Sequence, residues 1–184
     1  MDVRRLTLVI ALIALNLVGA RVANTLGLPF FLDTIATILA PVLLGLPLAL
    51  VVAVGTSALS SLINFPGDIW YAGTQVVIAL LAYGFARLGW FRSWWRALLA
   101  GAIIGAISAV VSAPVTMVLF KGVTVPGVTA VTGLFVASGQ DLWSSVLSGA
   151  LVTSSIDKIG SAFIAYMIIS RLPERFVLVG GRTD

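Results

Sequence analysis

ALLAGAIIGAISAVVSAPVTMVLF, residues Ala97 to Phe120, is the stretch that decides the fold. It carries no charged side chain, and at 1.5 Å per helical residue it is long enough to cross a hydrocarbon core of about 30 Å. The apolar run is continuous, whereas a strand of a membrane barrel would alternate apolar and polar side chains. The stretch therefore predicts a membrane-spanning α-helix.

The composition of the whole chain agrees with that helix. Of 184 residues, 60% are hydrophobic and only 10% are charged, against about 25% charged residues in ordinary soluble domains. Six segments can each supply about twenty mostly apolar residues. We therefore predict an all-α integral membrane protein, a single transmembrane domain over residues 1–184, with six spans at about residues 6–26, 31–46, 47–63, 71–88, 97–120 and 142–169.

The basic residues indicate how the spans are oriented. Lys and Arg are retained in cytoplasmic loops, and an inside N-terminus places most of the basic residues on the cytoplasmic side. We therefore expect both termini in the cytoplasm and a location in the plasma membrane. The net charge of +4 reads as a topology signal and not as a nucleic-acid surface, because the basic residues flank apolar segments. The residues on the predicted cytoplasmic side are Arg4, Arg5, Arg87, Arg92, Arg96, Arg171, Arg175 and Arg182.

Missing residue types exclude several kinds of chemistry. The chain has neither cysteine nor histidine, so thiolate nucleophiles, an imidazole base and the usual zinc sites are unavailable. The phosphate-binding pattern GxxxxGK[ST] and the hydrolase pattern GxSxG are also missing. We therefore expect no enzyme activity, no cofactor and no metal in this chain, and any ATP hydrolysis would belong to partner subunits.

Polar residues gather near the predicted external ends of the spans. Burying a polar group in hydrocarbon is unfavourable by several kcal/mol unless the group is paired or faces water. Asp141, Ser144, Ser145 and Ser148 share one helical face and could line a cavity. Interfacial aromatic residues are common in any membrane protein, which is the alternative explanation for Trp70, Tyr71 and Trp143. The predicted solute-binding residues are Asp33, Asn64, Asp68, Trp70, Tyr71, Gln75, Gln140, Asp141, Trp143 and Ser144.

Three charged residues lie within or beside apolar segments. Asp33 begins a predicted span, where it could cap the helix, pair with Arg21 or bind a solute. Asp157 and Lys158 are neighbours and lie about 100° apart on a helix, so we do not expect them to face each other. We expect Lys158 to extend toward the inner membrane surface and Asp157 to be satisfied by a neighbouring helix.

Small residues recur at helical spacing and predict close helix packing. Gly101, Gly105, Ser108 and Ser112 form such a stripe, which fits either packing within the bundle or a docking face for another subunit. The long outer loop from Lys121 to Gln140 is expected to fold over the external mouth of the bundle.

Four features together resemble the substrate-binding S components of energy-coupling factor (ECF) transporters. They are the six spans with both ends inside, Leu32-Asp33-Thr34 followed by an apolar run and Leu44-Gly45-Leu46-Pro47, the Ser/Gly-rich span after Asp141, and Asp157-Lys158-Ile159-Gly160 leading to Leu172-Pro173-Glu174-Arg175. The resemblance implies solute capture at the extracellular side, with a coupling transmembrane subunit and two cytoplasmic ATPases as partners. Such proteins often carry an AxxxA pattern in the first span for partner contact, and Gly19 and Ala23 are the nearest small pair here.

The expected function is capture of a small vitamin-like or heterocyclic solute from outside the cell. Trp70, Tyr71 and Trp143 could stack on a ring, while the polar candidates orient it. Two other functions remain open: a non-transporting membrane sensor or scaffold, and a facilitator that works alone.

Overall fold

A computed structural model describes residues 3–173, which form helices joined by turns and one extended segment. Within that range there is no strand, so the prediction of an all-α protein is confirmed. Five helical segments of the described chain are long and apolar enough to span a membrane. They are α1 (Val3–Thr25), α3 (Leu46–Ile63), the 3-10 turn η1 (Pro66–Tyr71) continued by α4 (Ala72–Arg87), α5 (Trp94–Phe120) and α7 (Leu142–Arg171).

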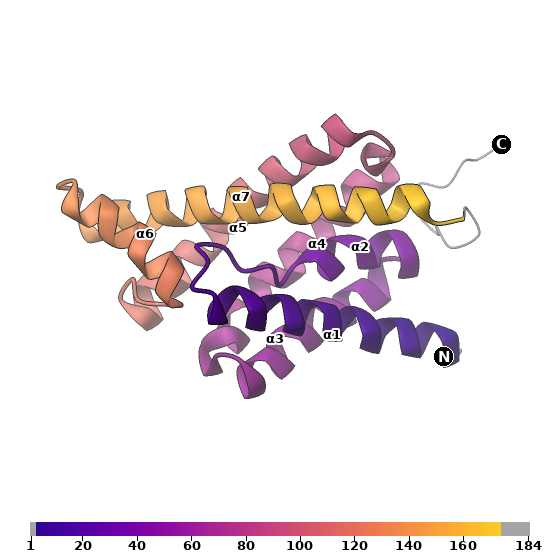
Figure 1. The fold of residues 1–184 in the computed structure, drawn as a ribbon, viewed down its shortest axis with the longest axis horizontal. Helices are drawn as coiled ribbons and strands as arrows, with labels where there is room; N and C mark the ends of the chain where they lie inside the picture. Colours follow the sequence, from indigo (N-terminus) through magenta and orange to yellow (C-terminus); the bar gives the residue numbers. More distant parts are fainter. Residues whose placement is uncertain (1–2, 174–184) are drawn as a thin grey trace.

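The two ends of the bundle differ (Figure 1). The start of α1, the end of α7 and the turn η2 (Trp90–Arg92), which joins α4 to α5, lie at one end, which we call the terminal end. The helix α6 (Pro126–Ala137) lies at the opposite end, the α6 end. The segments at the terminal end carry the described basic residues that were predicted to be cytoplasmic. Arg175 and Arg182 fall outside the described residues.

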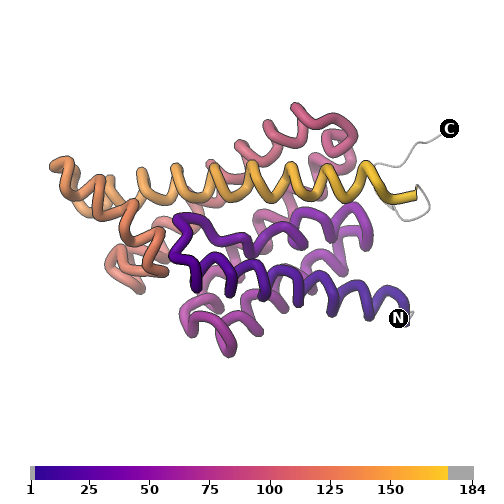
Figure 2. The backbone as a smooth tube through the Cα atoms, in the orientation of Figure 1, coloured from indigo at the N-terminus to yellow at the C-terminus, as the bar shows by residue number. Residues whose placement is uncertain are grey.

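The predicted span at residues 31–46 is helical only in its second part. The helix α2 covers Ile35–Leu44, ten residues that rise about 15 Å, half of a hydrocarbon core. Residues 26–34 lack helical structure and fold back from the α6 end into the middle of the bundle, where α2 begins (Figure 2). The chain thus contains a half-length helix preceded by an extended segment.

The extended segment and the start of α2 donate backbone hydrogen bonds to side chains of residues far away in the sequence. The N–H groups of Phe31 and Leu32 donate to Oδ1 of Asp157 at 3.2 and 2.8 Å. Leu32 has a φ of 52°, a left-handed conformation that a leucine rarely adopts. The N–H of Ala36, in the first turn of α2, donates to Oδ1 of Asn16 at 2.9 Å. Irregular backbone at membrane depth is tolerated only with such internal partners.

Glycines bring α5 and α7 into close contact. A Cβ atom on Gly101 would lie 2.5 Å from the carbonyl oxygen of Lys158, and one on Gly105 would lie 2.6 Å from the Cα atom of Ser155. Gly101 and Gly105 of the small-residue stripe therefore pack within the chain, the first of the two explanations considered for it, whereas Ser108 and Ser112 line a cavity.

The half of the bundle toward the terminal end is filled with apolar side chains, many of them alanines. Buried alanines from α2, α3, α4, α5 and α7 pack there with larger residues such as Leu12, Ile38 and Phe91. Apolar side chains such as Ile103 and Val110 are exposed on the outside of the bundle, as expected for a lipid-facing surface. The buried alanines of this half include Ala36, Ala40, Ala49, Ala82, Ala86, Ala97, Ala100, Ala162 and Ala165.

The loop predicted at residues 121–140 contains a helix, α6. Gly127 at its start packs against the extended segment, since a Cβ atom there would lie 2.3 Å from the carbonyl oxygen of Leu28. Thr132 packs against Gly149 of α7, where a Cβ atom would lie 2.7 Å from the threonine hydroxyl. The segment therefore closes over the helices at the α6 end.

Candidate functional site

A cavity lies inside the half of the bundle nearer α6. Its volume is about 80 Å³, room for several water molecules, since one needs about 10–15 Å³. The extended segment, α3, η1, α4, α5, α6 and α7 all contribute to its wall. Hydroxyl groups dominate the polar part of that wall, and they come from Thr56, Ser57, Ser60, Tyr71, Thr74, Ser108, Ser112, Thr116, Thr124, Thr132, Thr153 and Ser154.

Four of the predicted solute-binding residues line this cavity: Asp33, Asp68, Tyr71 and Gln75. They come from three different segments of the chain, and the fold brings them together. Asn64 lies beside a smaller neighbouring pocket of about 30 Å³ whose wall also includes Asp33 and Asp68.

The other five predicted residues lie away from the cavity wall. Trp70 and Trp143 are 61% and 44% exposed, which fits the interfacial explanation better than ring stacking inside a site. Asp141 caps α7 by accepting hydrogen bonds from the N–H of Ser144 at 3.1 Å and from its hydroxyl at 2.6 Å. These bonds hold the pKa of Asp141 below its usual value. Gln140 is exposed and accepts a hydrogen bond from Ser148 at 3.3 Å.

The face of α7 that lines the cavity differs from the predicted one. Asp141, Ser144, Ser145 and Ser148 were expected to line it, but the wall contains Val146, Ala150, Thr153, Ser154 and Lys158. A helix turns about 100° per residue, so the two sets point in different directions. Polarity alone selected the wrong face, because the serines near the start of α7 bond mainly to their own helix end.

Lys158 lies in the middle of α7 and contributes its ammonium group to the cavity wall. Its side chain is only 5% exposed, so the expected extension toward the membrane surface is wrong. The ammonium donates a hydrogen bond to Oδ2 of Asp157, although the two residues are adjacent in the helix. The long lysine side chain can fold back to its neighbour, which reasoning from helix angles alone did not consider.

Asp157 is fully enclosed and connects three parts of the structure. Its side chain is 0% exposed. Besides Lys158 and the two backbone N–H groups of the extended segment, the hydroxyl of Thr34 lies 3.4 Å from its Oδ2. The expectation that a neighbouring helix satisfies Asp157 is therefore wrong: its partners are Lys158 of its own helix and the backbone of the extended segment.

Asp33 neither caps α2 nor pairs with Arg21. Thr34 occupies the N-cap position, and Arg21 is exposed on the surface. Oδ1 of Asp33 lies 3.8 Å from the Lys158 ammonium, and Oδ2 accepts a hydrogen bond of 2.9 Å from Gln75. The side chain keeps 28% of its surface accessible, so it faces the cavity and is not sealed in protein.

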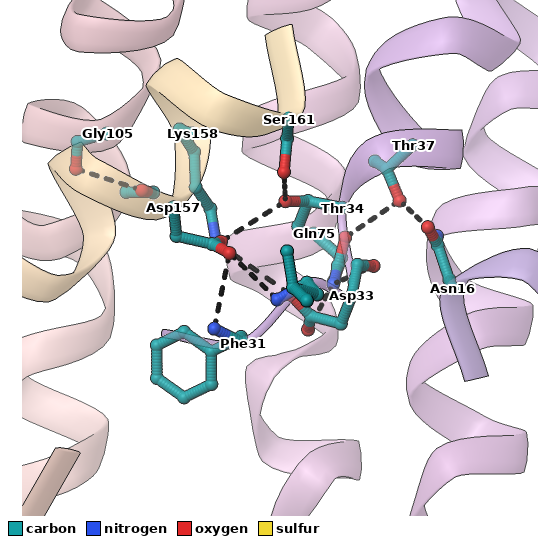
Figure 3. A network of polar contacts seen from close by, with 12 residues as sticks. Asn16, Phe31, Asp33, Thr34, Thr37, Gln75, Gly105, Asp157, Lys158 and Ser161 are labelled. Carbon is teal, nitrogen blue, oxygen red and sulfur yellow. Dashed lines mark hydrogen bonds and ion pairs between the residues drawn. The ribbon is translucent and has the colours of Figure 1, made fainter. Parts of the chain in front are cut away.

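A chain of hydrogen bonds runs from this cluster to Asn16 of α1 (Figure 3) and from there to Thr56 of α3. Thr37 donates to Gln75 at 2.9 Å, and Asn16 donates to the hydroxyls of Thr37 and Thr56 at 2.9 and 3.1 Å. All four side chains are buried. The network fixes the orientation of the Gln75 amide, and this amide in turn holds the carboxylate of Asp33 in place. Only Gln75 among these four was predicted as a site residue, because threonines and a single asparagine in apolar helices carry no distinctive pattern.

Gly19 and Ala23, the predicted partner-docking pair, are used within the chain. A Cβ atom on Gly19 would lie 2.1 Å from the carbonyl oxygen of Leu32, and Ala23 is buried. The extended segment covers this face of α1, so the two residues offer no free surface to another subunit.

The described residues contain no group of three or more histidine, cysteine or acidic side chains that could hold a metal ion. No protein-family model, curated protein or solved structure matches the chain. The chemistry that the site offers is therefore read from its own residues: hydroxyls, two carboxylates, an amide and an ammonium around a small, partly open space, with no nucleophile activated by a base.

Proposed function

We propose that this protein is the membrane-embedded solute-binding subunit of an ECF-type importer. It would capture a small vitamin-like or heterocyclic solute at the extracellular side of the plasma membrane. The observation that supports this best is the partly open cavity toward the α6 end, in whose wall Asp33 and Gln75 are held by a buried network. Largely preformed pockets with a few fixed polar groups are typical of small-molecule sites.

The proposed topology has six crossings and both termini in the cytoplasm. In it, α2 and the extended residues 26–34 together make the second crossing, a broken span whose helix starts in the membrane interior. Broken spans of this kind often surround solute sites in transporters. The arginine-rich segments of the terminal end favour a cytoplasmic position by the positive-inside rule, which leaves the cavity on the extracellular side.

The proposed partners are a coupling transmembrane subunit and two cytoplasmic ATPases. The alanine-rich half of the bundle lies between the cavity and the terminal end, so a bound solute has no path inward through the protein as it stands. Release would then require energy and a rearrangement that partners supply. This argument also weighs against a facilitator that works alone.

Calorimetric titration of the purified protein with a panel of vitamins tests the proposal. We expect one solute to bind tightly. The variant Thr74→Val, which removes a hydroxyl from the cavity wall, should weaken that binding about two- to tenfold, the contribution of one hydrogen bond. Trp143→Phe, outside the cavity, is the control and should bind as the unmodified protein does.

Two further results would decide against the proposal. If no member of the panel binds and no ATPase copurifies with the protein from its native membrane, a sensor or scaffold becomes the better explanation. If liposomes that contain this chain alone accumulate the solute, the protein is a facilitator without ATPase partners.

A further inference from the structure

The walls of the two pockets present hydrogen-bond acceptors that have no donor. Four buried side-chain oxygens among the described residues lack a hydrogen-bond partner: Oδ1 of Asp33, Oδ1 of Asn64 and the hydroxyl oxygens of Thr74 and Thr124. Each of these residues lines one or both pockets. A buried polar atom without a partner is unfavourable by about 1–3 kcal/mol. The oxygens of Asp33 and Asn64 can only accept, so they favour a solute that brings donors, whereas the two threonine hydroxyls can donate or accept.

The charged side chains around the cavity also favour a solute with hydrogen-bond donors. The only basic side chain in the cavity wall is Lys158, and its ammonium is bonded to Asp157 behind the wall. Asp33 is 3.8 Å from that ammonium, too far for a hydrogen bond, and Asp68 accepts only from the hydroxyl of Ser60. Lys158 thus shares its single charge between Asp157 and the more distant Asp33, and Asp68 has only the neutral Ser60 hydroxyl as a partner among the contacts of the described residues. The charge around the cavity is therefore net negative.

Thr74 is the clearest of these unpartnered groups. It is only 9% exposed, it lines the cavity, and its hydroxyl oxygen has no partner in the first turn of α4. Helical threonines commonly satisfy themselves by bonding to a carbonyl one turn earlier, as Thr153 does with Gly149 at 2.8 Å. The hydroxyl of Thr74 is therefore available for a hydrogen bond to a bound solute.

Aromatic rings line the same space. Phe31, Phe65 and Tyr71 are all in the cavity wall. The ring of Tyr71 is stacked on Phe120, with centroids 5.9 Å apart, and Phe65 packs against the same phenylalanine at 5.6 Å. The faces of such rings attract cations. The Lys158 ammonium already lies 5.3 Å from the centre of the Phe31 ring.

From these four observations we propose that the cavity binds a compact organic cation with N–H donors, held by Asp33 and Asp68 against the rings of Phe65 and Tyr71. The inference rests on the proposed solute-binding function and specifies the class of its solute. Carboxylates accept charge-assisted hydrogen bonds from N–H groups, which are about twice as strong as neutral ones. The small volume limits the part of the solute that enters to a few non-hydrogen atoms or a single ring.

Four probes test the inference with the full-length protein in detergent: three benzene derivatives of similar size but different charge, and one smaller cation. They are benzylammonium, benzyl alcohol, benzoate and tetramethylammonium, the last a cation without N–H donors. Ligand-detected NMR and calorimetry should rank benzylammonium first, tetramethylammonium second, and the neutral and anionic probes behind them. A sodium or magnesium salt at equal ionic strength should not compete.

Asp68→Asn is the decisive variant, because asparagine keeps an oxygen for the Ser60 hydroxyl and so leaves the fold in place. It should weaken benzylammonium binding about tenfold, as the loss of a charged hydrogen-bond partner predicts, and leave benzyl alcohol binding unchanged. Asp141→Asn, an exposed carboxylate outside the cavity, is the matched control and should change neither.

Other outcomes would overturn the inference, and they separate it from the proposed function. Preferential binding of benzoate or benzyl alcohol, or a tight neutral or anionic ligand in the vitamin panel, would refute the cationic class while the solute-binding function stands. Displacement of benzylammonium by sodium or magnesium alone would assign the site to inorganic ions. If neither the four probes nor any vitamin binds, both proposals fail.

Discussion

The backbone N–H of Leu32 donates a hydrogen bond of 2.8 Å to Oδ1 of Asp157, a residue 125 positions further along the chain. This bond and its neighbour from Phe31 fix the extended segment to the middle of α7. The same carboxylate holds the Lys158 ammonium, so one buried side chain organises both the irregular backbone and the charge of the cavity.

Replacing Asp157 should therefore be strongly destabilising. Asp157→Ala leaves two backbone donors and a buried ammonium without their main partner, and breaking a buried ion pair on one side costs about 3–5 kcal/mol. The free energy of unfolding in detergent would measure this loss. Asp157→Ala combined with Lys158→Met removes both charges and should lose less than the single variant. An Asp157→Ala protein as stable as the unmodified one would contradict the role given to this carboxylate.

Two glycines on the packed pair α5 and α7 provide a matched test of helix contact. Gly105→Ala places a methyl group 2.6 Å from the backbone of Ser155, so α5 and α7 must separate and the protein should unfold at a lower temperature. Gly160→Ala on α7 meets nothing within 4 Å. It should be neutral or stabilise by up to about 1 kcal/mol through helix propensity. Equal melting temperatures for the two variants would be incompatible with the contact.

Asn16 should be more important to stability than its place in an apolar helix suggests. Asn16→Leu removes the acceptor for the N–H of Ala36 and the donor to Thr37 and Thr56. Each buried group left unpaired costs about 1–3 kcal/mol. Hydrogen exchange at the start of α2 should become faster, while Thr7→Leu, an exposed position on the same helix, should leave it unchanged. Unaltered exchange in Asn16→Leu would show that another group supports α2.

The cap of α7 should respond to acid. Hydrogen bonds from Ser144 lower the pKa of Asp141 from its usual 3.8, so the cap is complete above pH 3.8 and is lost as the pH falls through the lower folded value. The protection of the first amides of α7, measured as the exchange rate relative to that of an unstructured peptide at the same pH, should fall over that acidic range. Asp141→Ala should show fast exchange already at neutral pH. Identical exchange in the two proteins at neutral pH would contradict the capping role.

Single cysteines can test the orientation, because the natural chain has none. Ser138→Cys follows α6, and Ser170→Cys lies near the end of α7; both positions are exposed. In intact cells a membrane-impermeant maleimide should label the cysteine at position 138. It should label the cysteine at position 170 only after the membrane is permeabilised. The reverse pattern would place the cavity on the cytoplasmic side and contradict capture from outside.

Hydropathy predicts the long spans well, because a continuous apolar run of sufficient length has few other stable structures in lipid. The predicted span at residues 97–120 and the helix Trp94–Phe120 end at the same residue. The same reasoning extended a helix over Phe31 and Leu32. Their side chains are apolar, but their backbone donors pair with Asp157, and nothing in the local sequence reports that pairing.

The candidate site was predictable only in part for a related reason. Polarity near a helix end selected Asp33 and Gln75, which line the cavity, and equally Gln140 and Trp143, which do not. Which of these faces the interior depends on helix rotation, and one sequence does not fix rotation. Lys158 was missed as a cavity residue because it pairs with Asp157, the residue next to it in the sequence. This pairing depends on the conformation of the lysine side chain and not on the spacing of the two residues along the helix.

The alanine-rich half of the bundle also bears on the passage of water and ions through the protein. Side chains such as Ala40 and Ala100 leave no polar row along which water or ions could pass from the cavity to the terminal end. An uncharged, close-packed layer of this kind is a barrier to ions, because a charge that enters it leaves water without gaining a partner.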